Sequence, residues 1–302
     1  MTAISFPSSF PSEEKMMNVL KKTMEKSWRI DLDIENIERW LNNFSGKVFN
    51  KDTERKLALW LLCNFTYYNE DEVNYLCELL FSKLIHQILI DEDKTSEEEA
   101  EECVLSSAFT SIGRASESGG LLLYHFRQEA QLDLDRFIFP TAIEETPCDK
   151  IICIDDVMIS GGTASRFFHA VKDRIKDKKI YYITLITTDA AIEKLMALGI
   201  SVIYCIKLDE RNRVFSDQSL VFYKFPELLQ HTKKLAEEYG KIIEPEKPLG
   251  HKSGQFLFGL YYNIPNNCLP IFWSSNNWEP IFERKEKYQN AKQAKRKYDY
   301  YI

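Results

Sequence analysis

The chain has 302 residues, of which 44% are hydrophobic and 13% aromatic, a composition typical of a globular protein and not of a disordered one. Its formal net charge of −7 excludes a protein that is drawn to nucleic acid by its overall charge. The seven cysteines form no C-x-x-C pair and the first residues do not read as a secretory signal, so we expect a cytoplasmic protein with reduced thiols and no membrane segment.

The first 95 residues have the hydrophobic period of helices. Apolar side chains recur at intervals of three and four residues, as at Ile34, Ile37, Leu41 and Phe44. The stretches "NKDTER" and "NEDEVN" offer capping side chains and first-turn acids to the helices that follow them. We predict an N-terminal helical bundle over residues 1–95, with the acidic run "DEDKTSEEEAEE" (91–102) as a linker.

From residue 103 strand-like and helical segments alternate. "CVLSSAFTSI" and "FIFPTAI" look like strands, and "KIICIDD" is an apolar run with a polar end, as expected of a parallel strand buried on both faces. "ASRFFHAVKDRI" has helical spacing, "KIYYITLITTD" is strand-like, and "AAIEKLMALG" and "SVIYCIKLD" repeat the alternation. We therefore predict an α/β domain with a Rossmann-like parallel sheet over residues 96–240.

Beyond residue 240 the regularity fades into a C-terminal extension, residues 241–302. The stretch "QFLFGLYYNIPNNCLPIFW" is β-prone up to Tyr262 and loop-like after it. Asn266 and Asn267 lie between two prolines, where their amides could read the edge of a base or equally serve two turns. Seven lysines and arginines fall within 284–297, which is either a solvated end or an arm that contacts phosphate.

Residues 151–165, "IICIDDVMISGGTAS", are the most informative stretch of the chain. Ligands of open α/β sheets bind beyond the carboxyl ends of the strands, where we expect Asp155 and Asp156, directly after the strand. "SGGTA" begins the next helix, whose unpaired N–H groups and dipole favour an anion, and its glycines let the backbone approach a phosphate. Adjacent carboxylates need donors, which vicinal sugar hydroxyls or a hydrated Mg²⁺ supply. The stretch therefore suits a ribose 5-phosphate.

Other interpretations account for less of this stretch. A Walker loop requires Gly-Lys-Ser/Thr after its turn, and a dinucleotide fingerprint requires G-x-G-x-x-G; neither is present. An ordinary strand–turn–helix with an N-cap serine explains "SGG" but leaves the acid pair unexplained.

The stretch resembles the phosphoribosyl pyrophosphate (PRPP) loop of type I phosphoribosyltransferases, with a serine in place of the commoner first threonine. The chain is still more similar to the PRTase-CE domains of bacterial conflict and anti-phage loci, including some retrons. That similarity lies in "WLNNF" and "LALWLLCNFTYY", in "FTSIGRASESGGLLLYHFRQE" (109–129) and in "YYNIPNNCLPIFWSSNNWEPIFER" (261–284). It spans most of the chain and implies the type I phosphoribosyltransferase fold, with the C-terminal extension as a hood over the base.

The resemblance also implies roles for individual residues. Asp155 and Asp156 would hold the ribose hydroxyls and, through water or substrate, Mg²⁺. The 5-phosphate would lie against Ser160, Gly161, Gly162, Thr163 and Ala164. A pyrophosphate loop would supply Arg114, a third candidate catalytic residue, with Ser116, Ser118 and Gly119, unless "TSIGRASESGG" is a surface turn with an incidental arginine. The hood would offer Asn266 and Asn267 to the base, with Trp273 or Tyr262 stacking on it.

Two functions from different classes remain open. One is an enzyme that transfers or cleaves at ribose C1 as an effector of anti-phage defence, with a reverse transcriptase and its nucleic acid as candidate partners. The other is an inactive module that senses a nucleotide and regulates a partner, alone or as an oligomer. Active phosphoribosyltransferases commonly carry a mobile basic loop, and residues 130–150 offer only Arg136 before Lys150. That departure weighs against classical nucleotide synthesis.

Overall fold

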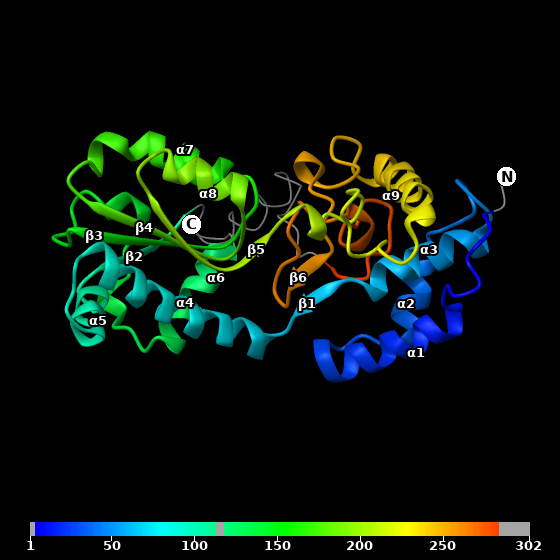
Figure 1. Ribbon diagram of the computed structural model, residues 1–302, viewed down its shortest axis with the longest axis horizontal. Helices are drawn as coiled ribbons and strands as arrows, with labels where there is room; N and C mark the ends of the chain where they lie inside the picture. Colours follow the sequence, from blue (N-terminus) through cyan, green and yellow to red (C-terminus); the bar gives the residue numbers. More distant parts are fainter. Residues whose placement is uncertain (1–3, 113–117, 284–302) are drawn as a thin grey trace, which may run out of the picture.

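The computed structural model describes residues 4–112 and 118–283, and its central element is a four-stranded sheet (Figure 1). All of its strands are parallel, and neighbours in the sheet are also neighbours in the chain: β2 (Ala108–Ser111), β3 (Lys150–Met158), β4 (Lys179–Thr188) and β5 (Ser201–Leu208). The predicted α/β fold with a parallel sheet is confirmed. The strand expected at "FIFPTAI" is replaced by a single bridge between Phe137 and Phe109.

Alternate side chains of each strand enter two apolar cores, one on each face of the sheet. Ile151 and Cys153 of β3 belong to the core beneath α7 (Gly162–Val171) and α8 (Asp189–Met196). Ile152 and Ile154 enter the other core, which α4 (Glu70–Asp91) and α6 (Ser118–Glu129) cover. Burial on both faces explains why the β3 sequence is a continuous apolar run.

Helices dominate the N-terminal part of the chain, as the sequence predicts. The capping side chains lie where expected: Asn50 accepts a hydrogen bond from the Thr53 amide at 2.9 Å, and Asn69 from the Glu72 amide at 2.9 Å. The helices besides those that cover the sheet are α1 (Glu13–Thr23), α2 (Ile34–Leu41), α3 (Lys51–Cys63), α5 (Glu97–Leu105) and α9 (Leu229–Ile243).

The N-terminal helices and the described part of the C-terminal extension pack together beside the main sheet (Figure 1). Strand β1 (Thr66–Tyr68) pairs in parallel with β6 (Phe258–Leu260), and the indole N–H of Trp40 donates to the carbonyl of Ile271 at 2.7 Å. One apolar core is continuous from these segments to the sheet. The division of the chain at residues 95 and 240 stays a prediction, and the basic tail at 284–297 lies outside the described residues.

The acidic run at 91–102 is mostly helix and not linker. Ser96 caps α5 by accepting from the Glu99 amide at 3.3 Å, and the acids of the first turn complement the helix dipole. Ala100, Cys103 and Val104 are buried at helical spacing. This short apolar stripe holds α5 against the fold, although charges dominate its sequence.

Helix α4 is, within the described residues, the one helix long and apolar enough to cross a membrane by length and composition. It packs against β4, β5, α5 and α6, and its buried side chains include Val73, Leu80 and Ile88. One face of this helix is therefore packed into the fold.

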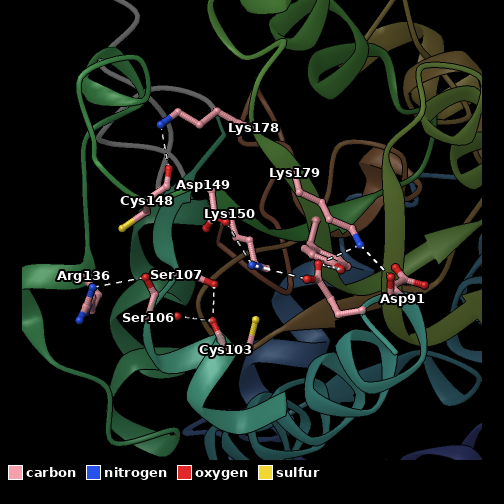
Figure 2. A network of polar contacts seen from close by, with 12 residues as sticks. Asp91, Cys103, Ser106, Ser107, Arg136, Cys148, Asp149, Lys150, Lys178 and Lys179 are labelled. Carbon is pink, nitrogen blue, oxygen red and sulfur yellow. Dashed lines mark hydrogen bonds and ion pairs between the residues drawn. The ribbon is translucent and has the colours of Figure 1, made fainter. Parts of the chain in front are cut away.

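A network of polar contacts surrounds the amino ends of β3 and β4 (Figure 2). This is the edge of the sheet opposite the carboxyl ends of the strands. Glu92, just beyond α4, lies 3.6 Å from the ammonium of Lys150 and 2.9 Å from that of Lys179. On a loop nearby, Arg136 donates to the Ser106 carbonyl at 3.3 Å. These contacts hold Lys150, Lys179 and Arg136 at this edge of the sheet.

Candidate functional site

A pocket of about 220 Å³ lies at the carboxyl ends of β2 and β3, where open parallel sheets bind their ligands. Three segments that are distant in the chain meet there. They are the end of β3 with the glycine turn, the start of α6, and part of the C-terminal extension. The residues on which the site depends are Ser118, Gly119, Asp155, Asp156, Ser160, Gly161, Gly162, Thr163, Ala164, His251, Asn263, Asn266 and Asn267.

The acid pair lies within β3 and not beyond it, which corrects the expected end of the strand. β2 stops at Ser111, opposite Ile154, but β4 continues to pair with β3 as far as Met158. The strand segment that carries the acid pair is therefore unpaired on the β2 side and hydrogen-bonded to β4 on the other side. Asp156 is only 3% exposed, so its carboxylate is not the solvated strand end that the sequence suggests.

The two carboxylates have different protein partners, because successive residues of a strand point to opposite faces. Asp155 accepts a hydrogen bond from the Tyr182 hydroxyl at 2.7 Å and from the backbone amide of Asp156 at 2.9 Å. Asp156 accepts from the backbone amide of Val157 at 2.9 Å and, weakly, from the Asn263 side chain at 3.5 Å. Asn263 thus connects the C-terminal extension to the acid pair.

Burial raises the pKa of Asp155 well above its ordinary value, and the neighbouring charge of Asp156 raises it further. The hydrogen bond from Tyr182 opposes this shift without cancelling it. Burial, followed by the charge of Asp155, raises the pKa of Tyr182, which therefore remains a donor. A ligand that brings hydroxyl donors or positive charge to this place would stabilise the ionised pair.

The glycine turn forms as the sequence predicts. Gly161 has φ +59°, in the left-handed region that favours glycine, and it is the N-cap of α7. The amides of the first turn of a helix have no partner within the helix and can bind an anion. In α7 the Gly162 amide donates weakly to the Ser160 hydroxyl, at 3.4 Å, and the amides of Thr163 and Ala164 follow it at the pocket. Thr187 and Thr188 donate to the carbonyls of Met158 and Ile159, at 2.9 and 2.7 Å, and so hold the chain that enters the turn.

We expect Gly161→Ala to weaken ligand binding more than stability. A Cβ at this position would lie 3.3 Å from the Ala191 carbonyl, in a backbone conformation that costs an L-residue about 1–2 kcal/mol. Gly199 is a matched control, because its φ is +75° and no atom lies within 4 Å of an added Cβ. Thermal unfolding should show similar losses for the two alanine variants, whereas only Gly161→Ala should lose affinity for a phosphorylated ligand. Equal affinities would mean that the turn does not hold the phosphate.

The residues predicted for the pyrophosphate loop divide into two groups. Ser118 and Gly119 line the pocket, and the added Cβ of Gly119 would lie 3.7 Å from a carboxylate oxygen of Asp155. Arg114 and Ser116 lie outside the described residues. The glycine turn and the start of α6 are therefore brought to the acid pair, as the sequence predicts.

The two adjacent asparagines of the extension differ in their contacts: the side chain of Asn267 forms a hydrogen bond within the protein, whereas that of Asn266 is available at the pocket. Asn267 is buried, and its amide donates to the carbonyl of His251 at 3.1 Å, which is the turn interpretation. Asn266 lines the pocket; its backbone carbonyl accepts from the His251 amide at 2.7 Å, and its side chain forms no hydrogen bond with the described residues. Of the two, Asn266 is the residue placed to meet a ligand.

The aromatic residues expected to stack on a base do not line the pocket. Trp273 is 2% exposed and donates to the Cys268 carbonyl at 3.1 Å, so the stacking role is wrong for it. Tyr262 stacks on His125, with ring centroids 6.4 Å apart and an interplanar angle of 9°. Its hydroxyl is buried without a hydrogen-bond partner in the described part of the chain, and burial followed by the charge of Asp156 raises its pKa.

Sequence reasoning missed Tyr182, Asn263 and His251. Tyr182 has a recognisable signal, since it is a polar-tipped residue in a central strand and is paired with Cys153, two positions before Asp155. Asn263 and His251 have none, because their positions depend on how the extension folds back over the sheet.

The donor set does not fit a metal held by protein ligands alone. Within residues 4–112 and 118–283, no group of three His, Cys, Asp or Glu side chains could hold an ion. Asp155 and Asp156 also already accept hydrogen bonds from protein donors. Two carboxylates do fit Mg²⁺ that arrives with a phosphorylated ligand, because this ion keeps several waters and takes few protein ligands.

Comparison with known proteins gives one match that covers most of the chain: the model of the family described as PRTase-CE matches residues 37–284. No match was found among curated proteins.

Solved structures offer partial likenesses. The orotate phosphoribosyltransferase of Aeropyrum pernix is 13% identical over 34% of this chain, with a TM-score of 0.27, and the chain spans 61% of its length. The xanthine-guanine-hypoxanthine phosphoribosyltransferase of Helicobacter pylori is 16% identical, over 48% of this chain and 88% of that one, with a TM-score of 0.33. A hypothetical protein from Neisseria gonorrhoeae with bound ppGpp is 12% identical, over 58% and 98%, with a TM-score of 0.33.

Proposed function

The chain belongs to the PRTase-CE family, and from this premise we propose that its pocket binds PRPP or a ribonucleoside 5′-monophosphate and that the chain transfers or cleaves at ribose C1. The observation that carries the proposal is the composition of the pocket. An acid pair, of which Asp156 is buried, and a glycine turn at a helix N-terminus line the same cavity, together with Asn266 of the extension. The acids can accept hydrogen bonds from ribose hydroxyls, the glycine turn can bind a phosphate, and the Asn266 amide can hydrogen-bond to a base.

The acid pair would hold the ribose. Vicinal hydroxyls donate hydrogen bonds to carboxylates, and such bonds to an ionised acceptor are stronger than neutral ones. Tyr182 keeps the Asp155 carboxylate in place by its 2.7 Å hydrogen bond. A ribose bound here would orient C1 relative to the start of α6, where Ser118 and Gly119 line the pocket.

Catalysis at C1 depends on position and charge. Loss of a leaving group gives the sugar oxocarbenium character, so anchoring both the hydroxyls and the 5-phosphate holds the reacting carbon in one place. Mg²⁺ bound with the ligand, at Asp155 and Asp156 through water or substrate, would neutralise charge on the leaving group. Arg114 and Ser116 are proposed to complete the pyrophosphate loop.

A second candidate, a nucleotide sensor without turnover, is favoured by where the basic residues of 130–150 lie. Arg136 and Lys150 are bonded to Ser106 and Glu92 at the amino edge of the sheet, away from the pocket (Figure 2). They are therefore not placed to close over a substrate. A binding module would need the acid pair and the glycine turn but no such cover.

One experiment separates the two candidates. The purified chain is incubated with Mg²⁺ and either PRPP together with nucleobases as acceptors, or AMP with water as the acceptor, and released pyrophosphate or free base is measured. Release that disappears in Asp155→Asn supports the enzyme. Saturable binding without any release supports the sensor.

We also propose that the chain is a cytoplasmic effector of bacterial anti-phage defence, with a retron reverse transcriptase and its nucleic acid as candidate partners. The support is its similarity to the PRTase-CE domains of such loci. Cells that carry the complete locus should restrict phage plating, and the Asp155→Asn locus should not. Equal plating efficiencies would remove the link between this pocket and defence.

A further inference from the structure

Two cationic side chains outside the glycine motif converge on the space above the first turn of α7. A Cβ atom added to Gly162 would lie 3.4 Å from the Ser160 hydroxyl oxygen, 3.7 Å from a guanidinium nitrogen of Arg166 and 3.8 Å from the Lys252 ammonium. Because Gly162 has no side chain, these three groups face a volume that the chain leaves open. All three can donate hydrogen bonds to an anion.

Neither charge is neutralised by a carboxylate of the residues that the structure describes. In the described parts of the chain, no carboxylate lies within ion-pair distance of Arg166 or Lys252, and both side chains are exposed. Arg166 has one weak contact, from a guanidinium N–H to the Thr163 hydroxyl at 3.4 Å. By contrast, nearby Lys247 is already paired, 3.7 Å from Glu244.

Positive charge is concentrated at this end of the pocket. His251, which lines the pocket, has a lowered pKa because of partial burial and then because of the charges of Lys252, Lys247 and Arg166. The acid pair lies at the other end. The pocket therefore has a negative end and a positive end.

The loop that carries Lys252 is held in an unfavourable backbone conformation. Lys252, Ser253 and Gln255 all have left-handed φ values, of 53°, 52° and 57°. Such residues are strained and persist only where neighbouring structure fixes them. Here Arg213 donates to the Ser253 carbonyl at 3.0 Å, and the Val214 amide donates to the Gln255 carbonyl at 2.8 Å.

Two glycines let the same loop pack against the asparagine pair. Cβ atoms on Gly250 and Gly254 would lie 2.4 and 2.5 Å from the carbonyl oxygen of Asn267, closer than any side chain allows. The backbone of Lys252 is thus fixed from both sides, while its side chain is exposed and directed at the glycine turn.

We propose that Lys252 and Arg166 bind the 5-phosphate of the ligand and make the site select ribosyl compounds by the charge of that phosphate. This rests on the proposed function and adds to it, since Lys252 comes from the C-terminal extension and Arg166 from beyond the glycine motif. The dipole of α7 supplies only about half a positive charge. Two cations therefore provide most of the charge that balances a phosphate dianion.

The C-terminal extension therefore contributes residues to both ends of the pocket. Asn263 and Asn266 face the acid pair and the cavity, whereas Lys252 closes the phosphate end. An unphosphorylated riboside would leave the two cations without a partner and would gain little from them.

The test compares binding of ribose 5-phosphate and of ribose, by calorimetry, to the wild type, Lys252→Gln, Lys252→Arg and Lys224→Gln. Lys224 is exposed, does not line the pocket and has no ion pair within the described ranges, so it is the matched control. We expect Lys252→Gln to weaken ribose 5-phosphate binding by roughly 10- to 100-fold, the effect of one charge-assisted hydrogen bond. Lys252→Arg should restore most of the loss, and Lys224→Gln should bind as the wild type does.

Each outcome has a separate meaning. If the wild type binds ribose 5-phosphate and Lys252→Gln binds it equally well, the role of Lys252 is overturned while the proposed function stands. If the folded wild type binds no 5-phosphorylated ribose at all, the proposed function fails. Loss of affinity in Lys252→Gln that Lys252→Arg does not restore would indicate a structural role and would also overturn the proposal.

Discussion

Asp155→Asn is expected to weaken binding of a 5-phosphorylated ribose by roughly 100-fold while leaving the fold at least as stable as the wild type. The loss of affinity follows because an amide presents one acceptor and no charge to the ribose hydroxyls. Stability is retained because burial and the charge of Asp156 already disfavour the ionised Asp155 carboxylate. The amide can still accept from the Asp156 N–H and donate to the Tyr182 hydroxyl.

The pH dependence of stability gives this prediction a second readout. A carboxyl whose pKa rises on folding stabilises the fold below its ordinary pKa of 3.8, and that contribution is lost as the pH rises through the raised value. The stability of Asp155→Asn relative to the wild type should therefore increase with pH over this range. A matching test of Asp156 should use Asn and not Ala, because Asp156 is buried and Ala would leave its hydrogen-bond donors without an acceptor.

Asp217→Asn is the control, since this carboxylate is exposed and forms no ion pair in the part of the chain described. It should change neither affinity nor the pH profile. Wild-type affinity in Asp155→Asn would show that the carboxylate does not hold ribose. A marked loss of stability in that variant would contradict the electrostatic account of the pair.

Glu54→Ala should cause the largest loss of stability, about 3–5 kcal/mol, and a fall in Tm of roughly 10 °C. Glu54 is fully buried, and its carboxylate accepts from the amides of Gly46, Val48 and Phe49 at 2.7, 2.6 and 2.9 Å. It also accepts from the Tyr239 hydroxyl at 2.7 Å, which joins α3 to α9. Alanine would leave all of these buried donors without an acceptor.

Chemical denaturation measures this effect, with Glu101→Ala as the control because Glu101 is exposed on α5. Glu54→Gln should lose less than Glu54→Ala, since its amide oxygen still accepts from the loop. Ligand affinity of the folded Glu54→Ala protein should be unchanged, because Glu54 does not line the pocket. A loss below about 1 kcal/mol would mean that water replaces the carboxylate without cost.

Features that depend on residues close together in the sequence could be predicted, whereas features that depend on distant segments could not. The glycine turn depends on a few adjacent residues, so Gly161 and the start of α7 could be placed directly. The end of β3 could not, because its last residues are held by β4, whose pairing reaches Met158 after β2 has stopped.

The extension shows the same limit more strongly. Trp273 reads as a stacking residue in a loop, yet folding places it in the core beside Cys268. Lys252 carries no local pattern at all, because its position depends on Arg213, Val214 and Asn267 around a left-handed loop. In contrast, the linker predicted at 91–102 was wrong for a local reason: the charges of α5 obscured the stripe of Ala100, Cys103 and Val104, which has helical spacing in the sequence.

The central claim, that one pocket binds a 5-phosphorylated ribose, is tested most directly by calorimetric titration of the purified chain with PRPP and with AMP in the presence of Mg²⁺. The account predicts saturable binding at one site, with a Kd between about 1 μM and 1 mM, for at least one of the two ligands. It further predicts that adenosine, which lacks the phosphate, binds more weakly than AMP. No heat with either phosphorylated ligand and no shift of the thermal unfolding transition, for protein shown to be folded, would contradict it.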